Sequence, residues 1–185
     1  IIIVVPFSLR QNPFWIIKQY ADTLSSYPYA TVNTANFYYL WQGNWSGIVN
    51  EAPFGASLAL ALLAAVYTVI LWSRGRKSWR KLWIEETLCC LFIFWFVFCA
   101  ATGASWGFIG TAAMAFAFLI VLGLFIRKKD LSFLPWMGGL LFLLLYVFGI
   151  KMHERYLFPA FVLIALAYGL TRDRRILIVL VSITV

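Results

Sequence analysis

Four ionisable side chains of four different types lie within five positions of one another, at Lys151, His153, Glu154 and Arg155. Arginine offers a planar fork of donors to phosphate oxygens, lysine offers a point charge, and histidine can donate a hydrogen bond or carry a proton near neutral pH. Glu154 could orient its neighbours or bind a sugar hydroxyl. Because ionisable groups cost free energy at membrane depth, the group is a candidate site for a phosphate or another substrate. The alternative is a loop of charges that extend to the headgroup level beside Tyr156.

A second group of candidate residues lies in the aromatic and amide-rich segment 27–45. Aromatic faces stack on the C–H faces of sugars, and amides pair with hydroxyl groups. Asn33 and Asn36 are three residues apart, a spacing that predicts one shared helical face. The segment is interpreted either as a patch for a sugar or an acceptor, or as an interfacial aromatic belt with helix-capping amides. The residues of this patch are Tyr29, Asn33, Asn36, Asn44 and Trp45.

No other pattern in the sequence indicates a catalytic centre. We find no glycine-rich phosphate loop and no cluster with metal-ligand spacing, so no metal and no cofactor is predicted. Cys89, Cys90 and Cys99 all lie in one apolar segment, where we expect them to be buried as small hydrophobic residues rather than paired. Asp22 and Glu51 are single carboxylates that could act as a general base. Since single loop acids are more often solvated or capping, neither is assigned that role.

The composition predicts a membrane protein. Of the 185 residues, 63% are hydrophobic and only 12% are charged, whereas a soluble domain has roughly a quarter of its residues charged. A chain this apolar cannot cover itself with a polar surface, so we predict an all-α, polytopic bundle of transmembrane helices. The net charge of +8 does not indicate nucleic-acid binding, because the basic residues form short clusters between apolar runs.

Five apolar segments are each predicted to cross the membrane: 57–73, 86–102, 106–126, 131–149 and 157–170. The stretch 86–126 would form about 60 Å of straight helix, twice the hydrocarbon thickness, so it is predicted to be a hairpin that turns at "GASWG" (103–107). Residues 1–7 are expected to end one further span, and residue 176 to begin another. The chain is therefore interpreted as a fragment with helices missing at both ends.

The remaining polar region, 8–56, is predicted to be a structured loop that contains interfacial helices. Residues 12–24 begin with an Asn-Pro helix start and have the spacing of an amphipathic helix. The predicted organisation is thus one membrane-domain fragment, 1–185. It consists of this loop and of about five transmembrane helices, plus the start of another, within 57–185.

The distribution of charge predicts the orientation. Five basic residues lie in 74–81 and three each in 127–129 and 172–175, which makes 11 of the 15 Lys and Arg. The positive-inside rule favours a cytoplasmic location for these three segments. Alternation of the spans then predicts that 8–56 and 150–156 lie together on the extracytoplasmic side.

Two segments carry a resemblance to a known family. "KMHERYLFPA" (151–160) and "YPYATVNTANFYYLWQGNW" (27–45) together resemble the C-terminal half of bacterial multi-pass mannosyltransferase-like proteins of the GT-C superfamily. The relatives of this group include the GPI-mannosyltransferases and the protein O-mannosyltransferases. The resemblance covers most of the chain, with the "RDRR" at 172–175 as a further match.

This resemblance implies an enzyme of the bacterial cytoplasmic membrane with an extracytoplasmic active site. It would transfer a hexose, with mannose favoured, from a polyprenyl-phosphate carrier to a glycan, lipid or protein acceptor. The "HER" at 153–155 would be its outer polar motif, and we infer contact with the lipid-linked phosphate, together with Lys151. The catalytic acid of the family lies in an earlier outer loop that this chain is expected to lack. The alternatives are a transporter or flippase for lipid-linked sugars and a non-catalytic membrane protein.

Overall fold

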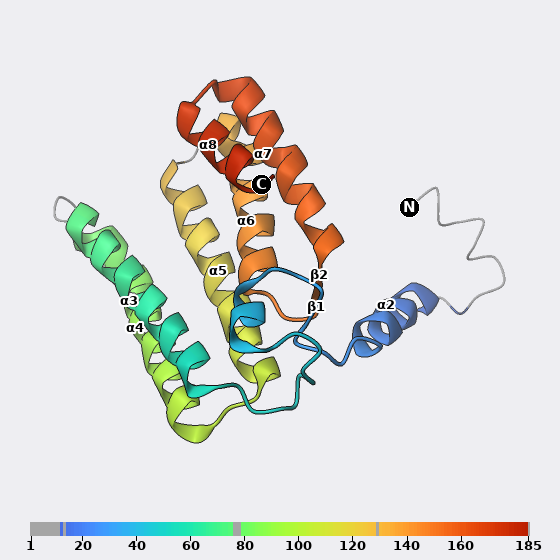
Figure 1. The fold of residues 1–185 in the computed structure, drawn as a ribbon. Helices are drawn as coiled ribbons and strands as arrows, with labels where there is room; N and C mark the ends of the chain where they lie inside the picture. Colours follow the sequence, from blue (N-terminus) through green and yellow to red (C-terminus); the bar gives the residue numbers. More distant parts are fainter. Residues whose placement is uncertain (1–11, 13, 76–78, 129, 185) are drawn as a thin grey trace.

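The computed structural model describes residues 12, 14–75, 79–128 and 130–184. Within these residues the chain forms seven α-helices, three short 3-10 helices and two very short strands (Figure 1). The expected end of a spanning helix at residues 1–7 lies outside the described residues.

Five helices are long and apolar enough to cross a membrane, as the sequence predicts. Their apolar windows have 18 to 23 residues, which gives about 27–35 Å at 1.5 Å per residue and matches the hydrocarbon thickness. The all-α fold and the multi-pass membrane architecture are therefore confirmed at this level. The five helices are α3 (Phe54–Gly75), α4 (Trp79–Thr102), α5 (Trp106–Lys128), α6 (Leu134–Phe148) and α7 (Phe158–Thr171).

Short 3-10 helices extend the last two spans. The 3-10 helix η2 (Leu131–Phe133) leads into α6, and η3 (Glu154–Leu157) leads into α7. Each of these α-helices carries a proline in its first turn, where the missing N–H has no intrahelical partner to lose. The added turns bring both spans to 18 residues.

The stretch 86–126 is a hairpin, as its length predicts. α4 ends at Thr102 and α5 begins at Trp106, and Gly103 between them has a φ of +66°. That left-handed conformation is readily available to glycine because it lacks a Cβ. A single glycine thus reverses the chain within the "GASWG" segment.

The α3–α4 pair forms one side of the bundle, and α5, α6 and α7 form the other (Figure 1). A buried cluster between the two sides includes Leu60, Ala61, Phe96 and Ala113. Small residues on α7 pack under Ile176 of the final helix, α8 (Arg174–Ser182). This helix folds back beside α7 and begins two residues before the predicted position.

The exposed surface of the spans is strongly apolar, which suits contact with lipid. Phe94 is 69% exposed, and its neighbour one turn earlier, Cys90, is exposed as well. The expectation that all three cysteines are buried is therefore wrong for Cys90. Because successive residues of a helix point about 100° apart, Cys89 and Cys90 cannot both face the packed side of α4. Cys89 and Cys99 are buried as expected.

The predicted amphipathic helix is α2 (Trp15–Ser25). Asn12 starts it, because its backbone oxygen accepts from Trp15 N at 2.8 Å and its side-chain oxygen accepts from Phe14 N at 3.0 Å. Phe14 and Ile17 are 69% and 66% exposed. Figure 1 shows α2 set apart from the bundle, so its apolar face is left open.

The alternating helices give the bundle two chemically different ends. One end, the basic end, carries the end of α3, the start of α4, the end of α5 and the α7–α8 connection. The other, the cap end, carries the 26–53 segment, the α4–α5 turn and the 149–157 connection (Figure 1). The two candidate groups of the sequence are thus found at the same end.

Candidate functional site

Residues 28–52 fold into a cap over one end of the bundle. Backbone hydrogen bonds join this cap to the start of α5, where Trp106 N donates to Asn50 O at 3.0 Å and Gly107 N donates to Ile48 O at 2.7 Å. The aromatic and amide-rich segment therefore has a defined position above the helices. It is a structured loop, as predicted, rather than a linker.

The cap pairs directly with the segment that carries the ionisable group. Strand β1 (Thr31–Val32) runs parallel to β2 (Met152–His153), with Thr31 opposite Met152 and Val32 opposite His153. Just before β2, Lys151 N donates to Ala30 O at 2.8 Å. Two parts of the chain that are far apart in sequence thus share one small sheet.

Side chains of the cap also bind the carbonyl groups at the end of α6. The Tyr38 hydroxyl donates to Phe148 O at 2.6 Å, and Asn36 Nδ2 donates to Gly149 O at 3.4 Å. Thr34 Oγ1 lies 3.0 Å from Met152 O. The last carbonyls of a helix have no intrahelical donor, so these bonds satisfy groups that would otherwise need water. They also hold the 149–153 connection in place.

Tyr38 is fully buried at this junction. Its ring makes edge-on contacts with Phe37 and Trp106, with centroid distances of 5.5 and 5.7 Å. Burial raises the pKa of the Tyr38 hydroxyl far above its usual range, because the apolar surroundings disfavour the phenolate. The hydroxyl therefore stays a hydrogen-bond donor at any pH at which the protein is studied.

The predicted shared helical face of Asn33 and Asn36 is wrong. Asn33 has a left-handed φ of +49°, and Asn36 is extended at the start of the 3-10 helix η1 (Phe37–Trp41). The Asn36 side chain accepts from Tyr39 N at 3.2 Å and is only 4% exposed. Its amide thus caps η1 and supports the cap, which corresponds to the helix-capping interpretation for this residue.

The other four residues of the patch lie together. Asn33 N donates to Asn44 Oδ1 at 2.9 Å, and Trp45 Nε1 donates to Asn33 Oδ1 at 3.2 Å. The rings of Tyr29 and Trp45 meet edge to face with their centroids 5.2 Å apart. Trp45 remains 54% exposed and Asn33 is exposed too. The arrangement presents an indole surface beside fixed amide groups, which suits a sugar ring and its hydroxyls.

The four ionisable residues at 151–155 lie in two different environments. His153 is half-buried, and within the described part of the chain its Nδ1 atom is buried without a hydrogen-bond partner. Glu154 and Arg155 open η3 and are exposed. Among the described residues no ion pair joins Glu154 to Arg155 or His153. Lys151 is half-buried and has a left-handed φ of +59°.

The small sheet sets these groups beside the patch. His153 lies opposite Val32, and Asn33 follows Val32 directly. On its other side β1 bridges to the patch, because Thr31 pairs in parallel with Asn44. Since neighbouring strands are about 4.8 Å apart, the cationic segment and the amide segment flank the same central strand.

The two single carboxylates lie elsewhere. Glu51 is exposed and sits against the α4–α5 turn, where its Oε2 atom would be 3.3 Å from a Cβ placed on Gly103. Asp22 is an exposed residue of α2, the helix set apart from the bundle. No catalytic base is assigned to either.

Sequence reasoning missed the residues that assemble the site, namely Thr31, Thr34 and Tyr38. Thr31 is fully buried, and within the described residues its hydroxyl oxygen has no partner. All three lie inside "TVNTANFYY". Their residue types do not distinguish a substrate site from an aromatic segment at the membrane interface. The signal that could have found them is the concentration of hydroxyl groups next to a predicted apolar core.

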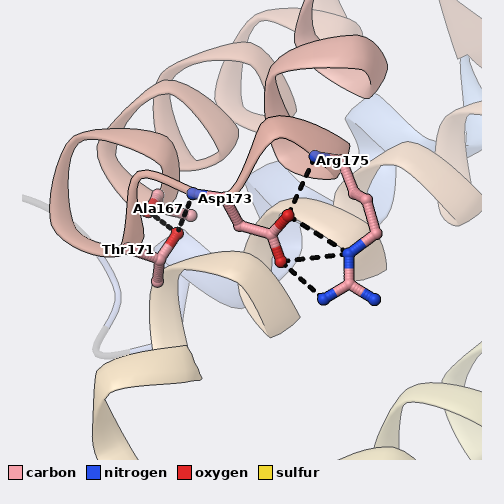
Figure 2. Close-up of polar contacts among 4 residues, drawn as sticks. All are labelled: Ala167, Thr171, Asp173 and Arg175. Carbon is pink, nitrogen blue, oxygen red and sulfur yellow. Dashed lines mark hydrogen bonds and ion pairs between the residues drawn. The ribbon is translucent and has the colours of Figure 1, made fainter.

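Asp173 and Arg175 at the basic end have a local explanation, in contrast to residues 151–155. Figure 2 shows the Asp173 carboxylate accepting from the Arg175 backbone N–H at 2.9 Å and from its guanidinium at 2.8–3.2 Å. Thr171 Oγ1 donates to Ala167 O at 2.8 Å and accepts from Asp173 N at 3.4 Å. These contacts end α7 and start α8, so the acid and the arginine here cap helices.

Comparisons of the chain with models of known protein families, with curated proteins and with solved structures gave no match.

Proposed function

We propose that the protein is a membrane glycosyltransferase that moves a hexose, with mannose favoured, from a polyprenyl-phosphate carrier to an acceptor. The observation that carries this proposal is the β1–β2 pairing, which sets residues 151–155 beside the exposed amide and indole patch. A phosphate-binding half and a sugar-binding half are the two parts that such a donor requires. The resemblance of these same two segments to the GT-C superfamily supports the reading.

In the proposed reaction the acceptor hydroxyl displaces the phosphate at the anomeric carbon. The new glycosidic bond forms as the bond from carbon to carrier phosphate breaks, and the electron pair leaves with the phosphate oxygen. The proton of the acceptor hydroxyl would pass to the catalytic carboxylate that the resemblance implies in an earlier outer loop. Arg155 would stabilise the charge that develops on that oxygen, with His153 and Lys151 beside it. Its exposure and its lack of an ion pair among the described residues leave the guanidinium available for this.

The patch would hold the sugar or the acceptor. Trp45 would stack on the C–H face of a pyranose ring, and Asn33 and Asn44 would pair with its hydroxyls. Tyr29 would fix the indole through its edge-to-face contact. Glu154 would accept from a hydroxyl at the boundary between the two halves.

The proposed orientation follows from the charges. With the basic end in the cytoplasm, as the positive-inside rule favours, the cap end faces the extracytoplasmic side. The placement of residues 151–155 in a connection between spans supports an enzyme over a transporter. A transporter would be expected to hold its polar residues near the bilayer midplane.

The test is transfer from synthetic polyprenyl-phosphate mannose in membranes that contain the full-length protein, with the outer loop that would carry the catalytic acid. We expect Arg155→Ala to lower the rate about 100-fold, as for loss of one stabilising donor, with partial recovery in Arg155→Lys. His153→Ala is expected to lower it less, and Lys18→Ala, an exposed cation of α2, to leave it unchanged. If Arg155→Ala and His153→Ala both transfer the sugar at the parental rate, the assignment of these residues to the site is wrong. Movement of the intact donor across the bilayer without any transfer would favour the transporter.

A further inference from the structure

A cavity separates α4 from α5 toward the basic end of the bundle. Figure 1 shows the two helices meeting at the 102–106 connection and diverging toward their other ends. The cavity encloses about 310 Å³, within the range of roughly 300–1,000 Å³ found for small-molecule sites. Its walls are apolar side chains of both helices, among them Leu88, Phe92, Phe116, Leu119 and Ile120.

One end of this cavity is polar. Glu85 of α4 binds Arg127 of α5 through Oε2 at 3.0 Å and through Oε1 at 3.1 Å. The Tyr67 hydroxyl of α3 donates to the same Oε1 atom at 2.8 Å. The pair with Glu85 uses two of the five N–H donors of the guanidinium. Further donors of Arg127 are therefore available to an anionic group.

A second, smaller cavity is lined by some of the same side chains. This cavity of about 170 Å³ shares Tyr67, Phe116 and Ile120 with the first and reaches Phe148 at the end of α6. The first cavity is thus apolar along α4 and α5 and polar at its Glu85–Arg127 end. The shape and polarity of the cavity therefore suit an amphiphile whose single alkyl chain lies along the helices.

The polar end of the cavity lies at the basic end of the bundle, where Arg127 and Lys128 end α5. The segments 74–86, 127–130 and 171–175 contain 11 Lys and Arg against four carboxylates. Lys128 follows Arg127 directly and is exposed, with its Nζ atom 4.1 Å from the centre of the Phe133 ring. Basic clusters between transmembrane helices attract anionic lipid headgroups.

We propose that this cavity binds an anionic phospholipid from the leaflet at the basic end. One acyl chain occupies the cavity between α4 and α5, and the phosphate lies at the Arg127–Lys128 end. The site is separate from the cap end, so it holds whether or not the protein transfers sugar. Its role is to fill the space where the α3–α4 pair diverges from α5.

The test uses the full chain reconstituted in mixed phosphatidylglycerol and phosphatidylcholine bilayers, then extracted for native mass spectrometry. We expect phosphatidylglycerol to be retained at least fivefold over phosphatidylcholine. Ile120→Trp fills the cavity and should reduce this retention at least fivefold. Phe125→Trp, which places the same side chain on α5 outside the cavity lining, should leave it unchanged.

A second variant changes the residue beside the proposed lipid phosphate, so that the proposal can still be tested if Ile120→Trp does not fold. Lys128→Gln changes an exposed side chain, so the thermal midpoint should stay within error while the preference for phosphatidylglycerol falls. Equal retention of the two lipids by the parent, or full retention in Ile120→Trp, would overturn the proposal. Displacement of the phospholipid by a polyprenyl phosphate would also overturn the proposal, because it identifies a different occupant. So would a dimer of the parent that Ile120→Trp abolishes, because a second copy of the chain would then cover the cavity.

Discussion

The Tyr38 hydroxyl and the Phe148 carbonyl oxygen lie 2.6 Å apart, which ties the cap to the last turn of α6. Tyr38 is fully buried, and the carbonyl is one of those that a helix leaves without an internal donor. The bond therefore satisfies a partly buried acceptor and fixes the start of the 149–153 connection. The candidate site depends on it, because β2 follows four residues later.

Tyr38→Phe should destabilise the protein by about 1 kcal/mol, because the partly buried Phe148 carbonyl loses its hydrogen-bond donor. The ring contacts with Trp106 are kept, so only the hydrogen bond is tested. Unfolding in detergent, followed by tryptophan fluorescence, measures the change. Tyr39→Phe is the matched control, since Tyr39 is 49% exposed. Equal effects of the two variants would show that the Tyr38 bond contributes nothing specific.

Glu85→Gln and Arg127→Gln should each destabilise the bundle, because either change leaves a partly buried charge without its partner. The Glu85 and Arg127 side chains are 17% and 36% exposed, so solvent weakens the effect and we expect roughly 1–2 kcal/mol each. The double variant should lose less than the sum of the two. A double-mutant cycle in detergent measures this coupling, and strict additivity would argue against a direct interaction.

Asp173 should make stability depend on pH in the acidic range. Hydrogen bonds from the Arg175 side chain and backbone hold the pKa of Asp173 below its usual range. A carboxyl with a lowered folded pKa contributes stability that is complete above its unfolded pKa of about 3.9 and is lost as the pH falls through the folded pKa.

Asp173→Asn isolates this charge, because asparagine is also a good N-cap. The parent should be more stable than the variant by a constant margin between about pH 5 and 7, and the margin should close as the pH falls below about 4. Thermal midpoints across this range measure it. A margin that does not change with pH would assign the effect to cap geometry rather than to charge.

Arg172→Gly should stabilise the α7–α8 connection by about 1 kcal/mol. Arg172 has a left-handed φ of +55° while its N–H donates to Tyr168 O at 2.8 Å. This is the helix-terminating position that glycine occupies without the Cβ penalty. Arg174→Gly, a change in the first turn of α8, removes the same type of charge and should not stabilise. A gain in thermal midpoint for both variants would indicate a charge effect.

The membrane architecture was predictable because its signals are local. A run of about 20 apolar residues has few alternatives to a spanning helix, and the length of 86–126 required a hairpin. The clusters of basic residues then predicted which connections share an end. Cys90 was misjudged because composition shows that a segment is apolar but not which of its faces is packed.

The assembly of the site was not predictable in the same way. β1 and β2 have two residues each and no alternating pattern, and their pairing joins positions about 120 residues apart. The spacing of Asn33 and Asn36 suits a helical face and a cap equally well, and the left-handed Asn33 decided between them. The residue types of both groups were visible in the sequence, whereas their relative placement is a property of the tertiary fold.

The parallel pairing of Thr31 with Met152 also sets an order of events during biogenesis. Residues 31–32 leave the ribosome long before β2, and α3, α4, α5 and α6 must all insert before their partner strand exists. Until the C-terminal end of α6 is in place, Tyr38 and Asn36 of the cap therefore lack their partners there. The β1–β2 pairing can form only after α3, α4, α5 and α6 have inserted. A chaperone or a quality-control protease that binds the unpaired cap would therefore distinguish chains in which any of these four insertions had failed.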